Sequence, residues 1–252
     1  MKIILAGCEG RMGKVVIELA KQKKHEIVCG ISRHEKKNND FMILDDINKF
    51  DGQADVLIDF SVANATGNFV YYCVEKKIPP VICTTGLNDK TENLIFEAAK
   101  KIPIFKSANM SLGINIIALI LKNFSQMLFD FDFDIEILEK HHNKKLDASS
   151  GTALLLAEMI KKSVKQNLNL DYERNHLRNK NDLGIVSVRG GNIVGEHEII
   201  FAGQNETIEI KHIAQSREIF ALGAIKAGEF ILNKNSGLYS MQDILKENLA
   251  QN

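Results

Sequence analysis

The sequence has no net charge, no long hydrophobic run and no targeting segment, and each absence excludes a class of protein. Its 32 basic residues balance its 32 acidic ones, so the chain has no global attraction to nucleic acid or to an anionic membrane. No uninterrupted apolar run reaches the roughly 18 residues of a membrane span. The apolar start, MKIIL, lacks the long h-region and the cleavage site of a signal peptide. We therefore expect a cytoplasmic protein with neither a nucleic-acid nor a membrane partner.

Cysteine is also scarce, and all four cysteines lie in the first third of the chain without C-x-x-C spacing: Cys8, Cys29, Cys73 and Cys83. A disulfide framework is typical of small secreted chains, and a zinc site needs tighter clusters of ligands. The cysteines are therefore expected to be reduced, buried thiols, and no metal site is predicted.

What the sequence does contain is a regular alternation of strand and helix patterns up to about residue 107. With 252 residues and 45% apolar side chains, the chain can bury a sizeable core. Strands are expected at 2–6, 27–31, 55–60, 80–84 and 104–107, and helices at 11–23, 63–77 and 89–101. Strands that alternate with helices predict a doubly wound α/β fold around a parallel sheet.

The pattern changes after residue 107. Helices are expected at 112–127, 152–165, 219–232 and 240–248, and strands at 131–138, 185–188, 196–202 and 206–213. The strand at 131–138 alternates apolar and acidic residues, which is typical of a half-exposed strand in an antiparallel or mixed sheet. The polar, asparagine-rich residues 165–182 are expected to form a surface loop.

A glycine turn follows the first expected strand and precedes the first expected helix, with the sequence GCEGRMG over residues 7–13. Glycines there allow a tight turn and a close approach of the backbone to a pyrophosphate, and the helix N-terminus offers free N–H groups to the anion. Arg11 would add a charge-assisted contact to phosphate. The spacing departs from the strict dinucleotide fingerprint, so a glycine-rich connection without a ligand is the alternative. Its place at the first βα turn favours a dinucleotide.

The end of the second expected strand bears on the choice of nucleotide. An acidic residue there would bond the ribose hydroxyls and favour NAD. The sequence instead reads GISRH over residues 30–34, without a carboxylate. Ser32 and Arg33 suit a ribose phosphate, so we expect the protein to use NADPH at least as well as NADH. The alternative is that Arg33 is only a solvated surface charge.

The densest group of reactive side chains lies in residues 139–153, EKHHNKKLDASSGTA. Near its end, Ser150 and Thr152 are good helix-capping residues, and Gly151 removes side-chain bulk. A helix N-terminus with free N–H groups and hydroxyls suits a carboxylate. This end of the segment is therefore a candidate site for an anionic substrate.

Two histidines and two lysines precede this cap: His141, His142, Lys144 and Lys145. Neighbouring residues of an extended segment point to opposite sides, so only one histidine is expected to face the substrate centre, where it would hold or release a proton near neutral pH. The lysines supply cations for an anionic substrate, and they disfavour a metal site because they would repel a divalent cation. The remaining alternative is an ordinary helix cap beside a solvated charged face.

Five segments along the chain read GCEGRMG (7–13), CTTG (83–86), SANMSLGIN (107–115), EKHHNKKLDASSGTA (139–153) and VRGGNIVGEH (188–197). In this order they resemble the 4-hydroxy-tetrahydrodipicolinate reductase family, formerly called dihydrodipicolinate reductase. The resemblance extends from residue 2 to about residue 245, and the HH-x-x-K-x-D-x-x-SGTA block is far more specific than the glycine turn. It implies reduction of a cyclic dicarboxylate with NADPH or NADH in lysine and diaminopimelate biosynthesis.

The resemblance also implies residue roles. Cofactor contacts would fall on Gly7, Cys8, Gly10, Arg11, Met12, Gly13, Cys83, Thr84, Thr85, Gly86, Ala108, Asn109 and Met110. His141 is the implied proton donor, and Lys145 is its catalytic companion. Substrate carboxylates would be held by His142, Ser150, Gly151 and Thr152.

The family's architecture implies a Rossmann domain over residues 1–107 and 217–252, and a substrate and oligomerisation domain over residues 108–216. It further implies a homotetramer and hinged closure of the two sites. Two positions depart from the family pattern. Ser149 replaces the usual proline, which removes some rigidity but no proposed contact, and Ser32 stands where many members carry an acidic residue.

Two other functions remain open on the residues alone. Another amino-acid or imine dehydrogenase would share the glycine turn but not the histidine and lysine block. A non-catalytic NAD(P)-sensing regulator would bind the cofactor without turnover, and it would be expected to carry a nucleic-acid or partner-binding element. No basic recognition helix is evident in the sequence.

Overall fold

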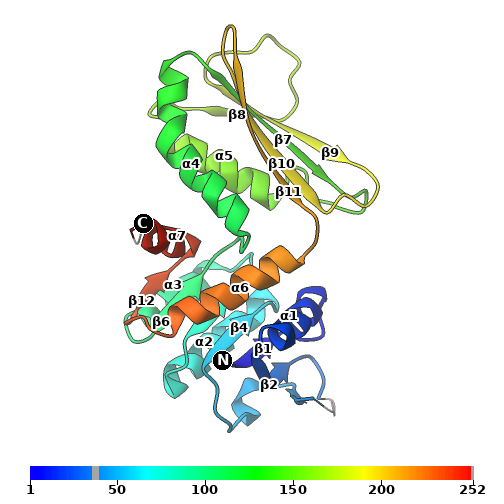
Figure 1. Ribbon diagram of the computed structural model, residues 1–252, viewed down its shortest axis with the longest axis vertical. Helices are drawn as coiled ribbons and strands as arrows, with labels where there is room; N and C mark the ends of the chain where they lie inside the picture. The colour runs from blue at the N-terminus through cyan, green and yellow to red at the C-terminus, as the bar shows by residue number, and fades with distance from the viewer. Residues whose placement is uncertain (36–39, 251–252) are drawn as a thin grey trace. The chain divides into compact units, whose positions relative to one another are not determined.

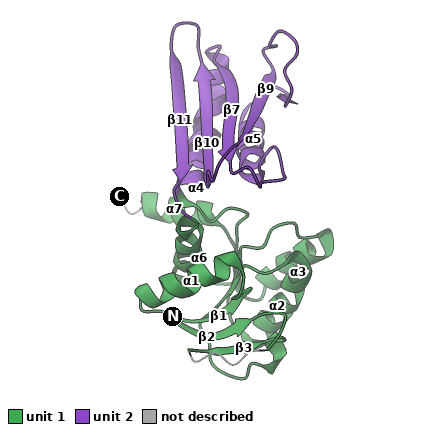
Figure 2. Ribbon diagram, turned by 90° about the vertical axis from the view of Figure 1, so that its right-hand side faces the viewer, with its two compact units in different colours: residues 1–112, 217–252 green, residues 113–216 purple. Residues whose placement is uncertain are grey.

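The computed structural model describes residues 1–35 and 40–250, and the chain forms two compact units (Figures 1 and 2). The first unit comprises residues 1–112 and 217–252, and the second comprises residues 113–216. The chain therefore leaves the first unit, builds the second and returns. The division falls at residue 112 rather than at the expected residue 107, and Met110 packs in the hydrophobic core of the first unit.

In the described residues, a seven-stranded parallel sheet runs through the first unit. Its strands are β1 (Lys2–Ala6), β2 (Glu26–Ile31), β3 (Met42–Leu44), β4 (Val56–Asp59), β5 (Pro80–Ile82), β6 (Pro103–Lys106) and β12 (Gly237–Tyr239). They are ordered β12-β6-β5-β4-β1-β2-β3, so the winding direction reverses between β1 and β4. This is the doubly wound, Rossmann-like arrangement that the sequence predicts. The pattern does not predict the three-residue strands β3 and β12.

Helices cover both faces of this sheet. They are α1 (Arg11–Gln22), α2 (Ala63–Lys76), α3 (Asp89–Ala99), α6 (Glu218–Ile231) and α7 (Met241–Ala250), with a 3-10 helix η1 (Ile47–Lys49). Helices α1 and α6 pack with Ile3 and Leu5 of β1 in one core, whereas α2 and α3 pack with Ile4 and Ala6 in another. Because successive residues of a strand point to opposite faces, the apolar run of β1 supplies both cores.

A mixed five-stranded sheet forms the second unit. Its elements are α4 (Leu112–Asp130), β7 (Asp134–His141), α5 (Gly151–Ser163), β8 (Asn169–Asp171), β9 (Asp182–Arg189), β10 (Gly195–Ala202) and β11 (Thr207–Ala214). The strand order is β11-β10-β7-β9-β8, with β7 parallel to β9 and antiparallel to β10. Helices α4 and α5 share one core with Ile135 and Ile137 of β7, so they cover the inward face of this sheet.

Among the described helices, α4 alone is long and apolar enough to cross a membrane, judged by length and composition only. Its residues Ile117, Leu121 and Phe129 are buried in the core of the second unit. A helix with one apolar stripe packed in this way is typical of the core of a globular unit.

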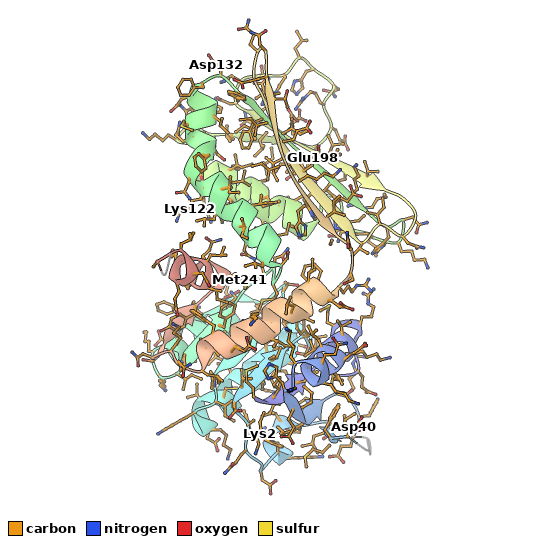
Figure 3. The ribbon with its side chains drawn as sticks, viewed as in Figure 1. Lys2, Asp40, Lys122, Asp132, Glu198 and Met241 are labelled. Atoms are coloured by element: carbon orange, nitrogen blue, oxygen red, sulfur yellow. The ribbon has the colours of Figure 1, made fainter. Side chains whose placement is uncertain are left out.

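Strand β7 begins and ends three residues later than the predicted strand at 131–138. Helix α4 continues through residue 130, and Asp132 lies in the turn that follows it (Figure 3). The φ of Asp132 is 63°. Phe131 is exposed in that turn. As predicted, Ile137 lies on the buried face of the strand. The same alternation places Glu139 and His141 on that face too. The first histidine of the pair therefore lies on the buried face of a strand.

All four cysteines are free and buried, as predicted. Burial raises the pKa of Cys29 to about 12, and it raises the pKa values of Cys73 and Cys83 above their usual range. Thiols with such pKa values stay protonated near neutral pH and are poor nucleophiles.

Candidate active site

The glycine turn between β1 and α1 leaves no space for side chains. Gly7 has a φ of +78°, and a Cβ on it would lie 2.6 Å from the carbonyl oxygen of Phe60. A Cβ on Gly13 would lie 2.3 Å from the carbonyl oxygen of Gly7. Helix α1 begins with Gly10 as its N-cap, which offers no side-chain cap. The first N–H groups of α1 therefore suit an anion, as in dinucleotide-binding turns.

A cleft of about 650 Å³ opens beside this turn within the first unit. Its walls come from the residues that follow β1, β2 and β4, together with η1 and the start of α2. Dinucleotides bind at this place in doubly wound folds, outside the carboxyl ends of the strands where the winding reverses. Four predicted cofactor residues line the cleft: Gly7, Gly10, Ser32 and Arg33. The size, the position and the uncapped helix end fit a nucleotide.

The other predicted cofactor residues lie outside the described lining of this cleft: Cys8, Arg11, Met12, Gly13, Cys83, Thr84, Thr85, Gly86, Ala108, Asn109 and Met110. Several of them follow β5 and β6, the strands next to β4 in the sheet. The Thr84 hydroxyl donates to the carbonyl oxygen of Asp59 at 3.3 Å. The side-chain oxygen of Asn109 accepts from the backbone N–H of Ser111 at 2.9 Å. These loops thus lie at the same carboxyl edge of the sheet as the cleft.

The carboxylate of Glu9 reaches the end of β2. Glu9 belongs to the glycine turn, and its carboxylate accepts a hydrogen bond from the Ser32 hydroxyl. Both residues line the cleft. The sequence has no carboxylate at the end of this strand itself, but the fold brings one there from the turn after the neighbouring strand. The sequence pattern misses Glu9 because the contact joins residues 23 positions apart.

In the second unit, Glu139 and His141 project from the same face of β7 because they are two residues apart. His141 Nδ1 lies 2.5 Å from Glu139 Oε2. The guanidinium of Arg189, at the end of β9, donates to both oxygens of Glu139, at 2.9 and 2.7 Å. The strand register pairs His141 with Arg189, so two parallel strands bring the three side chains together.

The N-terminus of α5 adjoins this cluster. Ser150 caps the helix because its Oγ accepts from the N–H of Ala153 at 3.2 Å, and its own N–H donates to Glu139 Oε1 at 3.0 Å. Ser150 Oγ also lies 3.1 Å from Nε2 of His197 on β10. The rings of His197 and His141 meet edge-on, with centroids 5.1 Å apart. The predicted proton donor and the predicted carboxylate site therefore share one cluster.

The groups of this cluster carry different charges. Burial would raise the pKa of Glu139, but hydrogen bonds from Arg189 and His141 hold it at about 2. Burial lowers the pKa of His141, although the hydrogen bond to Glu139 opposes that shift. Burial and the neighbouring His141 lower the pKa of His197 to about 4. Near neutral pH, Glu139 is therefore an anion and His197 is neutral.

The remaining predicted residues surround the cluster. Lys145 Nζ lies 2.8 Å from Asp147, and the charge of Lys145 acts to lower the pKa of His141. Thr152 is half-buried in the first turn of α5, where Gly151 is exposed. Nδ1 of His142 is buried and has no hydrogen-bond partner among the described residues.

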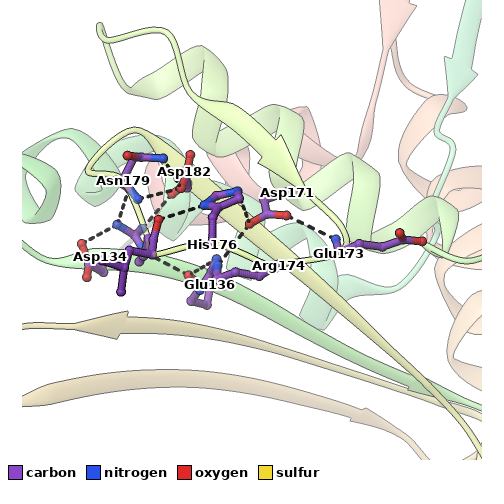
Figure 4. A network of polar contacts seen from close by, with 10 residues as sticks. Asp134, Glu136, Asp171, Glu173, Arg174, His176, Asn179 and Asp182 are labelled. Atoms are coloured by element: carbon purple, nitrogen blue, oxygen red, sulfur yellow. Dashed lines mark hydrogen bonds and ion pairs between the residues drawn. The ribbon is translucent and has the colours of Figure 1, made fainter.

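A second polar cluster lies around the loop after β8 (Figure 4). Ligand atoms of Asp171, His176 and Asp182 lie within 4.8 Å of one another, which is the spacing of a candidate cation site. Donors already engage both carboxylates, since Arg174 Nε donates to Asp171 at 3.1 Å and the N–H of Asn179 donates to Asp182 at 2.7 Å. A guanidinium beside the carboxylates opposes a divalent cation. We therefore infer that this network holds the loop against the sheet.

Three residues at the centre of the histidine cluster have no role in the sequence pattern: Glu139, Arg189 and His197. Strand alternation, which places Glu139 on the face of His141, was a usable signal. Arg189 and His197 lie in the segment VRGGNIVGEH, whose place in the fold only the strand pairing reveals. The contacts of these two residues join positions 50 and 47 residues apart.

The chain matches two family models, "Dihydrodipicolinate reductase, N-terminus" over residues 1–110 and "Dihydrodipicolinate reductase, C-terminus" over residues 113–245. It is 49% identical to the 4-hydroxy-tetrahydrodipicolinate reductase of Clostridium tetani, over 97% of each chain. It is 40% identical to that of Rickettsia rickettsii, over 98% of this chain and 99% of the relative. A solved structure of dipicolinate-bound dihydrodipicolinate reductase from Paenisporosarcina sp. TG-14 superposes with a TM-score of 0.78. At 20% identity, over 95% of this chain and 97% of that one, this likeness bears on the fold alone.

A parallel sheet with a cleft at its reversal is the arrangement of a Rossmann-type nucleotide-binding fold, and the family models and relatives make the chain an oxidoreductase that uses a pyridine nucleotide. The matches then give the particular group. The chain belongs to the dihydrodipicolinate reductase family, whose members among its relatives are named 4-hydroxy-tetrahydrodipicolinate reductase. The resemblance inferred from the motifs is thereby confirmed.

Proposed function

We propose that this protein reduces 4-hydroxy-tetrahydrodipicolinate to tetrahydrodipicolinate, a step of lysine and diaminopimelate biosynthesis. The observation that carries the proposal is the contact of His141 and Ser150 with one buried carboxylate, that of Glu139, which joins a proton donor to an anion site. In the balanced reaction, the substrate, NAD(P)H and one proton give the product, NAD(P)⁺ and water.

Each residue acts through its own chemistry. Bound NAD(P)H supplies the hydride. His141 donates a proton to the ring position that gains electron density, and the cation of Lys145 stabilises the charge that develops there. The first N–H groups of α5 and the free nitrogen of His142 hold the substrate carboxylates.

The cofactor is held by the first unit. The glycine turn would bind the phosphates, and the residues after β5 and β6 would face the nicotinamide: Cys83, Thr84, Thr85, Gly86, Ala108, Asn109 and Met110. Ser32 and Arg33, which line the cleft, would hold the ribose end of the nucleotide.

Oxidation of NADPH with freshly generated 4-hydroxy-tetrahydrodipicolinate tests the function. We expect turnover with this substrate and none in its absence. Preference for another imine or amino acid would indicate a related dehydrogenase. Cofactor binding without turnover would indicate a regulator.

The choice of nucleotide gives a prediction for Glu9. We propose that NADPH is used at least as well as NADH, because Arg33 is cationic and lines the cleft. The Glu9 carboxylate, beside Ser32, opposes a ribose phosphate by like-charge repulsion. We therefore expect Glu9→Gln to raise kcat/KM for NADPH relative to NADH by about tenfold.

Arg33→Ala serves as the opposite variant, and it should lower the same ratio. The measurement is kcat/KM with each nucleotide for the three proteins. A strong preference of the unmodified chain for NADH, or an unchanged ratio in both variants, would contradict this account of the ribose end.

A second prediction concerns the cap of α5. Thr152→Val keeps the shape of the side chain but removes its hydroxyl from the carboxylate site. We expect KM for the substrate to rise about tenfold with little change in kcat, because a hydrogen bond to a charged group is lost. Thr207→Val, on β11 of the same unit, is the matched control. An unchanged KM in Thr152→Val would remove this residue from the site.

The outward face of the second sheet supports a homotetramer. Val186, Val188 and Ile213 are exposed there. The strand register places Val188 and Ile213 in one row with Lys140 and Glu196, and Val186 in the next row with Leu138 and Glu198. An exposed apolar patch set among charges is typical of a protein interface. Sedimentation equilibrium of the full chain should give four times the mass of 28.2 kDa, and a monomer would contradict the proposal.

We also propose that the protein acts in the cytoplasm.

A further inference from the structure

The carboxylate of Glu139 is both fully buried and fully paired. Its Oε2 meets His141 Nδ1 at 2.5 Å and Arg189 Nη1 at 2.9 Å. Its Oε1 meets the N–H of Ser150 at 3.0 Å and Arg189 Nη2 at 2.7 Å. A carboxylate offers about four lone-pair sites, so no acceptor site remains for a substrate. Glu139 therefore acts on the reaction through other residues.

The contact with Glu139 determines which nitrogen of His141 carries the proton in the neutral ring. An ionised carboxylate only accepts hydrogen bonds, so Nδ1 must be the protonated nitrogen. Nε2 is then the atom that takes up and gives away the transferred proton. A Cβ on Gly195 would lie 3.1 Å from Nε2, so the glycine at this position leaves room around the reactive nitrogen.

Arg189 links the same carboxylate to the loop that carries Lys145. Its Nη2 also donates to the carbonyl oxygen of Asp147 at 2.5 Å, and Asp147 in turn pairs with Lys145 at 2.8 Å. The bidentate guanidinium balances the buried negative charge and fixes the direction of the carboxylate.

We propose that Glu139 is a positioning residue whose buried carboxylate, fixed by Arg189, anchors the imidazole of His141 and the capping residue Ser150 together. The proton donor and the carboxylate site then stay at a constant distance from each other. The neutral ring of His141 also stays in a single tautomer. This inference rests on the proposed function for the roles of His141 and Ser150. The contacts of Glu139 with Arg189, His141 and Ser150, which we call the anchor, do not depend on that function.

The anchor has a consequence for the pH dependence of the reaction. Among the described residues, the charged or titratable groups that face His141 from the surrounding elements are Glu139, Arg189, Lys145 and His197. Of these, Glu139 is the group that raises the pKa of His141, whereas Lys145 and Arg189 lower it, and His197 is neutral near pH 7. The donor must be protonated, so kcat falls as the pH rises through the pKa of His141. Without the anion of Glu139, this fall begins at a lower pH.

The test compares Glu139→Gln with the unmodified chain. Glutamine keeps the shape but not the charge, so we expect the alkaline limb of the kcat profile to move down by about 1 pH unit or more. Glu139→Asp keeps the charge and should restore the limb in part. Glu136→Gln is the matched control, because Glu136 is also a β7 carboxylate paired with arginines, here Arg174 and Arg178 of the loop after β8. The alkaline limb of this variant should stay in place.

A second readout follows His141 directly. Nitrogen-15 NMR of the unmodified full chain should show its neutral ring protonated on Nδ1, and Glu139→Gln should lower its titration midpoint. The proposal is overturned if the unmodified ring is protonated on Nε2, or if Glu139→Gln leaves both the titration and the pH limb unchanged. If the chain does not turn over the substrate but the NMR result holds, the proposed function fails and the anchor stands.

Discussion

Replacing His141 by glutamine is expected to lower kcat by about 100-fold or more and to leave the KM for NADPH nearly unchanged. Glutamine fills similar space and can still donate to Glu139, but it cannot give up a proton near neutral pH. Loss of a positioned general acid typically costs two to four orders of magnitude. Since we propose that the nucleotide binds in the first unit, its KM should not report the change. Steady-state kinetics with 4-hydroxy-tetrahydrodipicolinate measures both constants.

His176→Gln is the matched control for this prediction. His176 lies in the loop after β8, where its Nδ1 faces the carbonyl oxygen of Leu177 at 2.8 Å, and its replacement should leave kcat unchanged. Lys145→Ala should also depress kcat more than it raises KM, because the cation acts on the transition state. Near-normal turnover in both His141→Gln and Lys145→Ala would refute the roles given to these residues.

Replacing Gly13 by alanine should impair both folding and cofactor binding. A Cβ there would lie 2.3 Å from the carbonyl oxygen of Gly7 and 2.5 Å from that of Cys8. Both atoms are backbone, so the turn itself must move. We expect a loss of about 2 kcal/mol or more in stability, seen as a fall of about 4–8 °C in Tm, together with at least tenfold weaker NADPH binding.

Gly67→Ala provides the control for this glycine. Gly67 lies inside α2, and the nearest atom to a Cβ there is Leu94 Cδ2 at 3.8 Å. Alanine is about 0.5–1 kcal/mol better than glycine in a helix interior, so Tm should hold or rise. Thermal melts of both variants measure Tm, and fluorescence titration with NADPH measures their affinity for the cofactor. Equal behaviour of the two variants would show that the turn tolerates a side chain.

The strand and helix alternation of the first unit could be predicted because its signals are local. The buried run of β1 and the stripe of α1 are each contained in a few consecutive residues, and so is the turn between them. The short strands β3, β8 and β12 are not predicted from the sequence, because three residues carry too little periodicity to distinguish a strand from a loop. Alternation alone predicts that the strand of β7 begins at Phe131, because it does not show that α4 continues and a turn intervenes.

The candidate site was predictable only in part. His141, Lys145 and the Ser150 cap stand close together in sequence and carry recognisable chemistry. Arg189 and His197, which complete the cluster, come from strands much later in the chain. Arg189 reaches Glu139 because β7 and β9 lie side by side in parallel, and a strand register is a long-range property.

By itself, the sequence determined the class of fold, the glycine turn and the histidine block, because turn chemistry and capping depend on neighbours along the chain. The tertiary structure alone decided which charges meet. It brought Glu9 to the end of β2, where no carboxylate is encoded, and it buried Glu139 under Arg189, His141 and Ser150. The physical reason is that burial and charge pairing act through space, so that residues tens of positions apart set the ionisation of the groups that react.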